Sequence, residues 1–185
     1  LGAITNKMRE AGATVETDGD LYRVRAPEEI RATDIQTYPY PGFPTDLQAP
    51  FATMLTQAEG NSSIYETMYD GRLAYAKELA KMGASIDVSG SGRIAMVHGP
   101  TPLHGADVRA LDIRSGAAMI LAGLAAEGTT KVSNVIYIDR GYQDIAAKLE
   151  TLGAVISRVE ESDHPCPEVE CSEPLEWGTM SVTGS

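Results

Sequence analysis

The sequence predicts a mixed α/β fold made of repeated supersecondary units. The pair Gly-Ala recurs at 12–13, 83–84 and 153–154, about 70 residues apart, each time after a polar–apolar helix pattern and before a strand pattern. A second marker, Ala-Glu-Gly, recurs at 58–60 and 126–128 after apolar helix patterns. Matched helix ends at so long a period indicate duplicated units that bury their faces against one another. Strands that alternate with helices at this spacing favour parallel pairing.

The first repeat is expected to be half a unit. Residues 1–11 have the pattern of a helix that ends at Gly12-Ala13, and a strand follows at 14–16. The turn Asp18-Gly19-Asp20 suits a tight hairpin into a second strand at 21–25. A Pro-containing connection then leads into the second repeat.

The second and third repeats are expected to be complete, at about 40–99 and 100–160. Each reads as a helix, a strand, a turn with an Asp–Arg pair, a second helix, a strand and a hairpin strand. The apolar helices are expected to end on the glycines of Ala-Glu-Gly, which would serve as C-terminal caps. The expected apolar helices are 47–59 and 113–127, and the expected strands after Gly-Ala are 85–88 and 155–159.

Residues 161–185 form a tail that differs from the rest. Its first part is acidic and contains prolines, as linkers do. Residues 175–185 alternate like a strand, and one hypothesis is that this strand fills the vacant half of the first repeat, as in a circular permutation. The alternative is an unrelated edge strand. The predicted organisation is therefore one domain at 1–160, with partial unit 1–28, and a linker with a possible added strand at 161–185.

The two cysteines, Cys166 and Cys171, lie in this tail beside His164. A zinc site would need a fourth ligand. Zinc, a disulfide between the two cysteines and unpaired thiols therefore remain alternatives. No metal and no cofactor is predicted.

Composition excludes several classes of function. The chain has 185 residues, 43% of them hydrophobic, and a net charge of −11. A chain this negative is poorly suited to bind nucleic acid, because proteins bind nucleic acid mostly through cationic side chains that neutralise the phosphates. No run of 18 apolar residues predicts a membrane span, and no leader pattern is present. Low cysteine usage fits a cytoplasmic protein. The first residue already lies inside a helix pattern, which suggests that the sequence is a piece of a larger protein.

An Asp precedes an Arg at three places where a strand is expected to give way to a helix. Arg is unfavourable at a helix start, because that end already carries positive partial charge. Repeated placement there predicts an anion site made from backbone N–H groups and Arg side chains. The alternative is three Asp N-caps with solvated Arg side chains. The pairs are Asp70 and Arg72, Asp112 and Arg114, and Asp139 and Arg140.

The segment YPYPGFPTDLQ (38–48) places Asp46 on a loop stiffened by three prolines. Rigid support is what a general base requires. The alternative is that Thr45-Asp46 only supplies the N-cap of the following helix.

These strings together resemble the enolpyruvyl transferases. The resemblance covers residues 1–159 and is closest to the branch of the family that acts on UDP-N-acetylglucosamine. It rests on PGFPTDLQA, ETMYDGR, ALDIRSGAAMILAGLAAEGTT and YIDRGYQDIAAKLETLGA, in this order and spacing.

The resemblance implies a fold, a reaction and two substrates. The family has two domains, each of three βαβαββ units, and this chain resembles its C-terminal half. The reaction transfers the enolpyruvyl group of phosphoenolpyruvate to the 3-hydroxyl of UDP-N-acetylglucosamine and releases phosphate, the first committed step of peptidoglycan synthesis. The shikimate-3-phosphate branch and a non-catalytic binding or scaffold module are the alternatives.

The resemblance also assigns residues. Asp46 matches the Asp that hydrogen-bonds the sugar 3-hydroxyl and acts as base, and Arg114 and Arg140 match residues that hold phosphoenolpyruvate. Asp112 matches the acidic residue that lies beside phosphoenolpyruvate in the family. The remaining substrate-binding residues implied are Thr45, Met68, Tyr69 and Arg72, with Met68 acting through its backbone and Tyr69 replacing a usual Phe.

Two departures from the family's pattern stand out. Asp70-Gly71 replaces the usual Glu-Asn before Arg72. The family's first domain, with its Lys-Asn pair and the loop that carries a reactive Cys, has no counterpart, and Cys166 and Cys171 do not match that loop. The resemblance therefore implies a missing N-terminal domain as partner, and a chain that is inactive alone.

Overall fold

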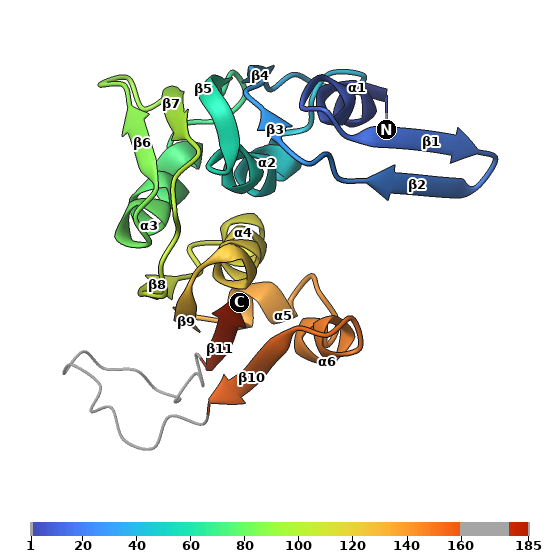
Figure 1. The fold of residues 1–185 in the computed structure, drawn as a ribbon. Coiled ribbons are helices and arrows are strands. Elements are labelled where there is room, and N and C mark those ends of the chain that lie inside the picture. Colours follow the sequence, from blue (N-terminus) through green and yellow to red (C-terminus); the bar gives the residue numbers. More distant parts are fainter. Residues whose placement is uncertain (1, 160–177, 185) are drawn as a thin grey trace. The chain divides into compact units, whose positions relative to one another are not determined.

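The computed structural model describes residues 2–159 and 178–184, which form two compact units (Figure 1). The units are Leu1–Leu103 and His104–Ser185.

The first unit begins with a helix and a hairpin. Helix α1 (Gly2–Glu10) is followed by β1 (Thr14–Asp18) and β2 (Leu21–Arg25), which pair antiparallel with Asp18 opposite Leu21. Gly19 in the turn has φ +56°, which glycine adopts without steric cost. The expected half-unit of helix, strand and hairpin strand is confirmed.

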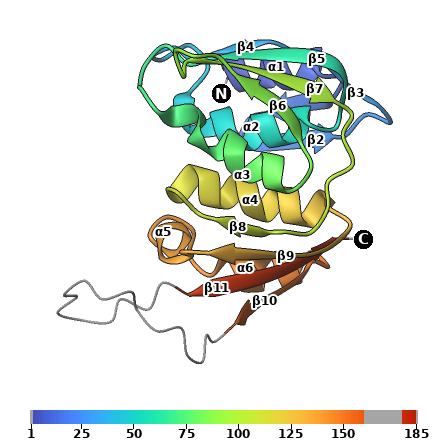
Figure 2. The same cartoon turned by 90° about the vertical axis from the view of Figure 1, so that its left-hand side faces the viewer.

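The rest of the first unit is a sheet with helices on one face (Figure 2). Strand β5 pairs with the parallel strands β3 and β4 along one edge and with the antiparallel strand β7 along the other. Strand β6 pairs antiparallel with the far side of β7. The fully buried Leu55, Ile64, Leu79 and Val97 form the core between sheet and helices. The elements are β3 (Ile30–Arg31), β4 (Ile35–Gln36), the 3-10 turn η1 (Thr45–Leu47), α2 (Gln48–Leu55), β5 (Ala58–Tyr65), the 3-10 turn η2 (Arg72–Ala74), α3 (Tyr75–Lys81), β6 (Ser85–Val88) and β7 (Ile94–Gly99).

The second unit repeats this topology. Its strand order is β8-β9-β11-β10, which matches β4-β5-β7-β6, with the first pair parallel and the other two antiparallel. The elements are β8 (Asp107–Arg109), α4 (Ile113–Ala125), β9 (Gly128–Ser133), α5 (Ile136–Asp139), α6 (Ile145–Glu150), β10 (Val155–Val159) and β11 (Thr179–Gly184). Two βαβαββ repeats and the second half of a third are present, so the predicted fold class is confirmed.

The permutation hypothesis for the tail is wrong. Strand β11 pairs with β9 and β10 of its own repeat, in the place that β7 occupies in the repeat before it, and makes no ladder with β1 or β2. Met180 and Val182 are fully buried, because the strand is central in its sheet.

The three Gly-Ala pairs end their helices in the same way. The glycines have φ of +103°, +96° and +94°, in the left-handed region. Each following alanine N–H donates to the carbonyl five residues earlier, which is the Schellman arrangement. The bonds are Ala13 to Met8 (2.9 Å), Ala84 to Leu79 (3.1 Å) and Ala154 to Leu149 (3.1 Å).

The Ala-Glu-Gly markers do not cap helices, contrary to the sequence prediction. Helix α2 ends at Leu55 and α4 ends at Ala125, earlier than expected. The residue after α4, Ala126, is already extended, with ψ 151°. Gly60 lies inside β5 and Gly128 opens β9, so the repeated motif marks the start of a strand.

Candidate functional site

Asp46 lies on a proline-containing segment that is anchored at Thr37, whose N–H donates to the Tyr65 carbonyl at 3.0 Å, and at Phe43. We call residues 37–48 the Asp46 segment. Buried Phe43 packs edge-on against Phe51 of α2, with ring centroids 5.3 Å apart. Asp46 itself stands in η1, with 75% of its side chain exposed, and its Oδ1 is 3.7 Å from Nη1 of Arg72.

The prediction that Thr45-Asp46 supplies a helix N-cap is wrong. The N-cap positions of η1 and α2 are Pro44 and Leu47, and neither provides a side-chain cap. The Thr45 hydroxyl donates to Glu66 instead. The Asp46 carboxylate is therefore exposed at the surface without capping η1 or α2.

Residues 66–72, which we call the Met68 turn, include Arg72 and place its guanidinium near Asp46. The Arg72 guanidinium stacks over the Tyr69 ring, 4.3 Å from its centroid. Asp70 is not a helix cap: it pairs with Arg93 at 2.5 Å, and Gly71 precedes η2 with φ +72°. Glycine adopts this conformation freely, so the departure at 70–71 is compatible with an ordered Arg72.

Glu66 is a buried residue of this site that sequence reasoning missed. Its carboxylate accepts five hydrogen bonds. The donors are the hydroxyls of Thr37 and Thr45, the amide nitrogen of the Gln48 side chain, and the backbone N–H groups of Met68 and Tyr69. Burial raises the pKa of Glu66, but the hydrogen bonds outweigh it and the pKa lies below its usual range. The signal was the alternation of β5: Ile64 is buried and Tyr65 exposed, so the next residue points inward.

In the second unit, Asp112 is the N-cap of α4. Its Oδ1 accepts from the backbone N–H groups of Arg114 and Ser115, each at 2.9 Å, and the Ser115 hydroxyl accepts from the Asp112 N–H at 2.8 Å. The Arg114 guanidinium pairs with the other carboxylate oxygen. The capping alternative is confirmed here, since the carboxylate of Asp112 already occupies those backbone donors.

The third Asp–Arg pair does not lie at a helix start. Asp139 is the last residue of α5 and Arg140 follows it. Asp139 pairs with Arg158 of β10, and this hydrogen bond raises the pKa of the Arg158 guanidinium. The prediction of three equivalent helix N-termini is therefore wrong, because α5 is a single turn that ends where the sequence suggested a beginning.

Close packing joins the two Arg-bearing elements of the second unit. A Cβ on Gly116 of α4 would lie 2.5 Å from Cγ1 of Ile138 in α5, and a Cβ on Gly141 would lie 1.8 Å from Cδ1 of Ile113. A Cβ at either position would require the isoleucine that it meets to move. The first turn of α4, with Arg114, is thus fixed against the end of α5, where Arg140 is exposed.

The structure therefore gathers the expected residues in two groups. Thr45, Asp46, Met68, Tyr69 and Arg72 come together in the first unit, and Glu66 joins them. The second group consists of Asp112, Arg114 and Arg140, on α4 and after α5.

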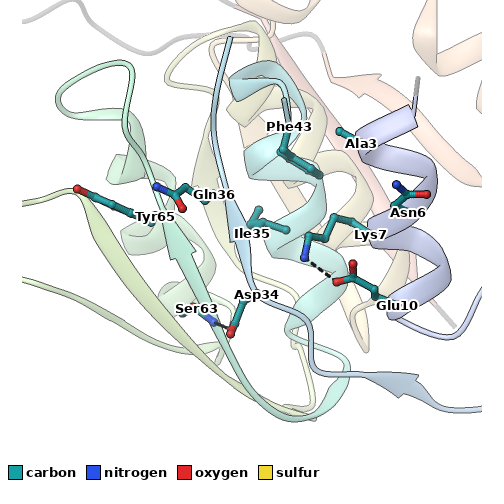
Figure 3. Close-up of a pocket in the computed structure, with 10 residues that line it drawn as sticks. All are labelled: Ala3, Asn6, Lys7, Glu10, Asp34, Ile35, Gln36, Phe43, Ser63 and Tyr65. Carbon is teal, nitrogen blue, oxygen red and sulfur yellow. Dashed lines mark hydrogen bonds and ion pairs between the residues drawn. The ribbon is translucent and has the colours of Figure 1, made fainter. Parts of the chain in front are cut away.

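A pocket of about 530 Å³ lies elsewhere in the first unit, between α1 and the β4–β5 edge (Figure 3). Some of the polar groups that line the pocket pair with one another. Lys7 contacts Glu10 at 2.6 Å, and the Asp34 carboxylate accepts from the Ser63 N–H at 2.7 Å. None of the expected site residues lines it.

Within the described residues, no three His, Cys, Asp or Glu side chains lie close enough to hold a metal ion. His164, Cys166 and Cys171, and with them the zinc and disulfide alternatives, lie outside the described residues. No helix in the described part of the chain has the length and apolarity needed to cross a membrane.

Comparison with known proteins gives a consistent family. The family model for EPSP synthase (3-phosphoshikimate 1-carboxyvinyltransferase) matches residues 1–149. UDP-N-acetylglucosamine 1-carboxyvinyltransferase 2 of Shouchella clausii is 45% identical over 93% of this chain and 40% of its own length. The corresponding enzyme 1 of Halalkalibacterium halodurans is 43% identical over 98% of this chain and 41% of its own. The chain thus spans about two fifths of these relatives.

Solved structures agree on the fold. The enolpyruvyl transferase NikO of Streptomyces tendae superposes with a TM-score of 0.76 and 29% identity, over 83% of this chain and 35% of that one. An EPSP synthase from Acinetobacter baumannii has a TM-score of 0.65 at 18% identity, over 99% of this chain and 39% of that one, and supports the fold alone.

Proposed function

The chain belongs to the EPSP synthase family of enolpyruvyl (carboxyvinyl) transferases, and on this premise we propose that it forms part of a UDP-N-acetylglucosamine enolpyruvyl transferase. The observation that carries the proposal is 43% and 45% identity, over nearly the whole chain, to enzymes of that name. The 3-phosphoshikimate alternative is less well supported, since the EPSP synthase structure is only 18% identical.

In the proposed reaction, the 3-hydroxyl oxygen of the sugar adds to C2 of phosphoenolpyruvate while C3 takes up a proton and becomes a methyl group. The bond from C2 to the phosphate oxygen then breaks as C3 loses a proton. Asp46 accepts the hydroxyl proton as the oxygen attacks. Its position suits this role, because the carboxylate is exposed on a braced segment and caps no helix. Phosphate leaves in the elimination step, which restores the double bond.

We assign Arg114 and Arg140 to the carboxylate and phosphate of phosphoenolpyruvate. A guanidinium offers paired donors that match both anions, which a Lys cannot do. Asp112 fixes the backbone and the guanidinium of Arg114. Met68, Tyr69 and Arg72, with Thr45, form the edge that receives the nucleotide sugar.

The rest of the site is proposed to come from polypeptide outside this sequence, in keeping with a chain that spans two fifths of its relatives. We therefore expect the 185-residue chain to bind substrates without turning them over. The repeat organisation proposed is a half-unit at 1–28 and two complete units, from β4 to β7 and from β8 to β11; the last unit ends with β11 (Thr179–Gly184) and not near residue 160 as expected.

An amide chemical-shift titration tests this proposal. UDP-N-acetylglucosamine is expected to cause saturable shifts at Asp46, Met68 and Tyr69, and phosphoenolpyruvate is expected to cause them at Arg114 and Arg140. A phosphate-release assay on the same sample is expected to stay at the blank rate. A well-dispersed spectrum that does not respond to millimolar sugar nucleotide would contradict the assignment, and phosphate release above blank would contradict the inactivity.

A further inference from the structure

Glu66 stands between the two segments that form the proposed sugar edge. It follows β5 directly and is fully buried. Its two oxygens face different partners. Oε2 accepts from Thr45 at 2.9 Å and Gln48 at 2.7 Å, which flank Asp46 in the Asp46 segment. Oε1 accepts from the N–H groups of Met68 at 2.7 Å and Tyr69 at 3.1 Å, in the Met68 turn.

A third contact strengthens the same junction. The Thr37 hydroxyl, at the start of the Asp46 segment, donates to Oε1 at 2.9 Å and accepts from the Thr67 N–H at 3.0 Å. The Thr67 hydroxyl donates to the Thr37 carbonyl. The two segments are therefore connected through one carboxylate and one pair of threonines.

All five partners of Glu66 donate to it in this structure, and the backbone N–H groups of Met68 and Tyr69 can only donate. An ionised carboxylate accepts with both oxygens, whereas a glutamine would accept with one oxygen and turn an NH2 group toward the partners on the other side. Gln48 is only 2% exposed, so its amide could not turn to water for a replacement partner. The charge of Glu66 is thus part of the structure of the junction.

We propose that Glu66 is a positioning residue for the sugar edge: its buried carboxylate sets the Asp46 segment and the Met68 turn at a fixed distance from each other. The 3.7 Å approach of Asp46 to Arg72 is one result of that spacing. The inference rests on the proposed function, because it takes Asp46 and Met68 as sugar contacts. Glu66 itself acts through other residues.

The test is Glu66→Gln in the 185-residue chain, with Glu78→Gln as the matched control. Glu78 is a second buried carboxylate of the first unit, on α3, where it pairs with Lys81 at 2.7 Å. Glu66→Gln is expected to weaken UDP-N-acetylglucosamine binding by about tenfold, or about 1.4 kcal/mol, while phosphoenolpyruvate binding is unchanged. Glu78→Gln is expected to leave both unchanged.

Hydrogen exchange gives a readout that needs no ligand. The N–H groups of Met68 and Tyr69 are expected to lose protection in Glu66→Gln, together with shifts at Thr45 and Asp46, and to keep it in Glu78→Gln. Unchanged exchange in Glu66→Gln, or an equal loss of sugar binding in both variants, would overturn the role of Glu66. Absence of binding by the unmodified chain would count instead against the proposed function.

Discussion

At the scale of single residues, Asp112 and Glu66 both accept hydrogen bonds from backbone N–H groups but hold different kinds of structure. Asp112 closes a local capping box within four residues of its own position. Glu66 joins groups as far as 29 residues away. A local cap can be read from a short motif. The strand pattern can indicate that Glu66 points inward, but its distant donors are identified only in the folded chain.

The stabilising effect of Glu66 is expected to depend on pH. Its pKa is lowered in the folded chain, against an ordinary value of 4.5, so its contribution is fully present above about pH 4.5 and is lost as the pH falls through the lower folded value. The difference in free energy of unfolding between the unmodified chain and Glu66→Gln should therefore be constant near neutrality and shrink in acid. Urea unfolding over a series of pH values measures it. A difference that persists unchanged into strong acid would argue against an ionised Glu66.

At the scale of helices and strands, the shared Gly-Ala ending sets the direction in which the chain leaves the last helix of each repeat. In all three copies the left-handed glycine reverses the chain, and the next strand starts within two residues. The same local geometry is thus used three times to lead the chain from the end of a helix into the next strand.

Gly153→Ala tests the helix ending without a steric complication, since a Cβ at this position meets nothing within 4 Å. The left-handed φ of +94° should cost about 1–2 kcal/mol of stability once a Cβ is present. Gly153→Asn should cost less, because Asn tolerates this conformation better. Urea unfolding gives the values, with Gly90→Ala, also in open space, as the control that should be near neutral. Equal effects of Ala at 153 and 90 would mean that φ is not the cause.

These elements also show what the sequence could predict. Gly-Ala endings, the Asp-Gly hairpin and the strands 85–88 and 155–159 depend on neighbours in the chain, and they were predicted correctly. Other features depend on partners that are distant in the sequence: the ends of α2 and α4, and the role of Asp139. The Asp139 carboxylate, for example, pairs with Arg158, 19 residues later. The Asp–Arg pairs and Asp46 were singled out from the residue pattern, whereas their roles came from the resemblance. Glu66 was missed because its donors are spread from Thr37 to Tyr69.

At the scale of the whole molecule, each complete repeat places its last strand inside the sheet. Strand β7 lies between β5 and β6, and β11 lies between β9 and β10. The closing strand of each repeat therefore supports both halves of its sheet, and its loss should affect more than an edge.

A chain that ends at residue 177 tests this arrangement. It lacks β11, including the fully buried Met180 and Val182, whose burial alone contributes about 3 kcal/mol or more. We expect the dispersed amide signals of β9 and β10 to be lost, while those of β5 and β7 remain. A chain that ends at Gly184 keeps the strand and serves as the control. Retained signals from β9 and β10 in the shorter chain would show that the sheet does not need its central strand.

The central position of β11 also has a consequence for biosynthesis. A ribosome releases the chain from its N-terminal end, so β9 and β10 emerge well before residues 179–184 do. Until then the two strands have no partner between them, and their backbone groups are open to other chains or to chaperones. In the first complete repeat, five residues separate β6 from β7, whereas 19 residues separate β10 from β11 in the second, so the second complete repeat waits longer for its central strand.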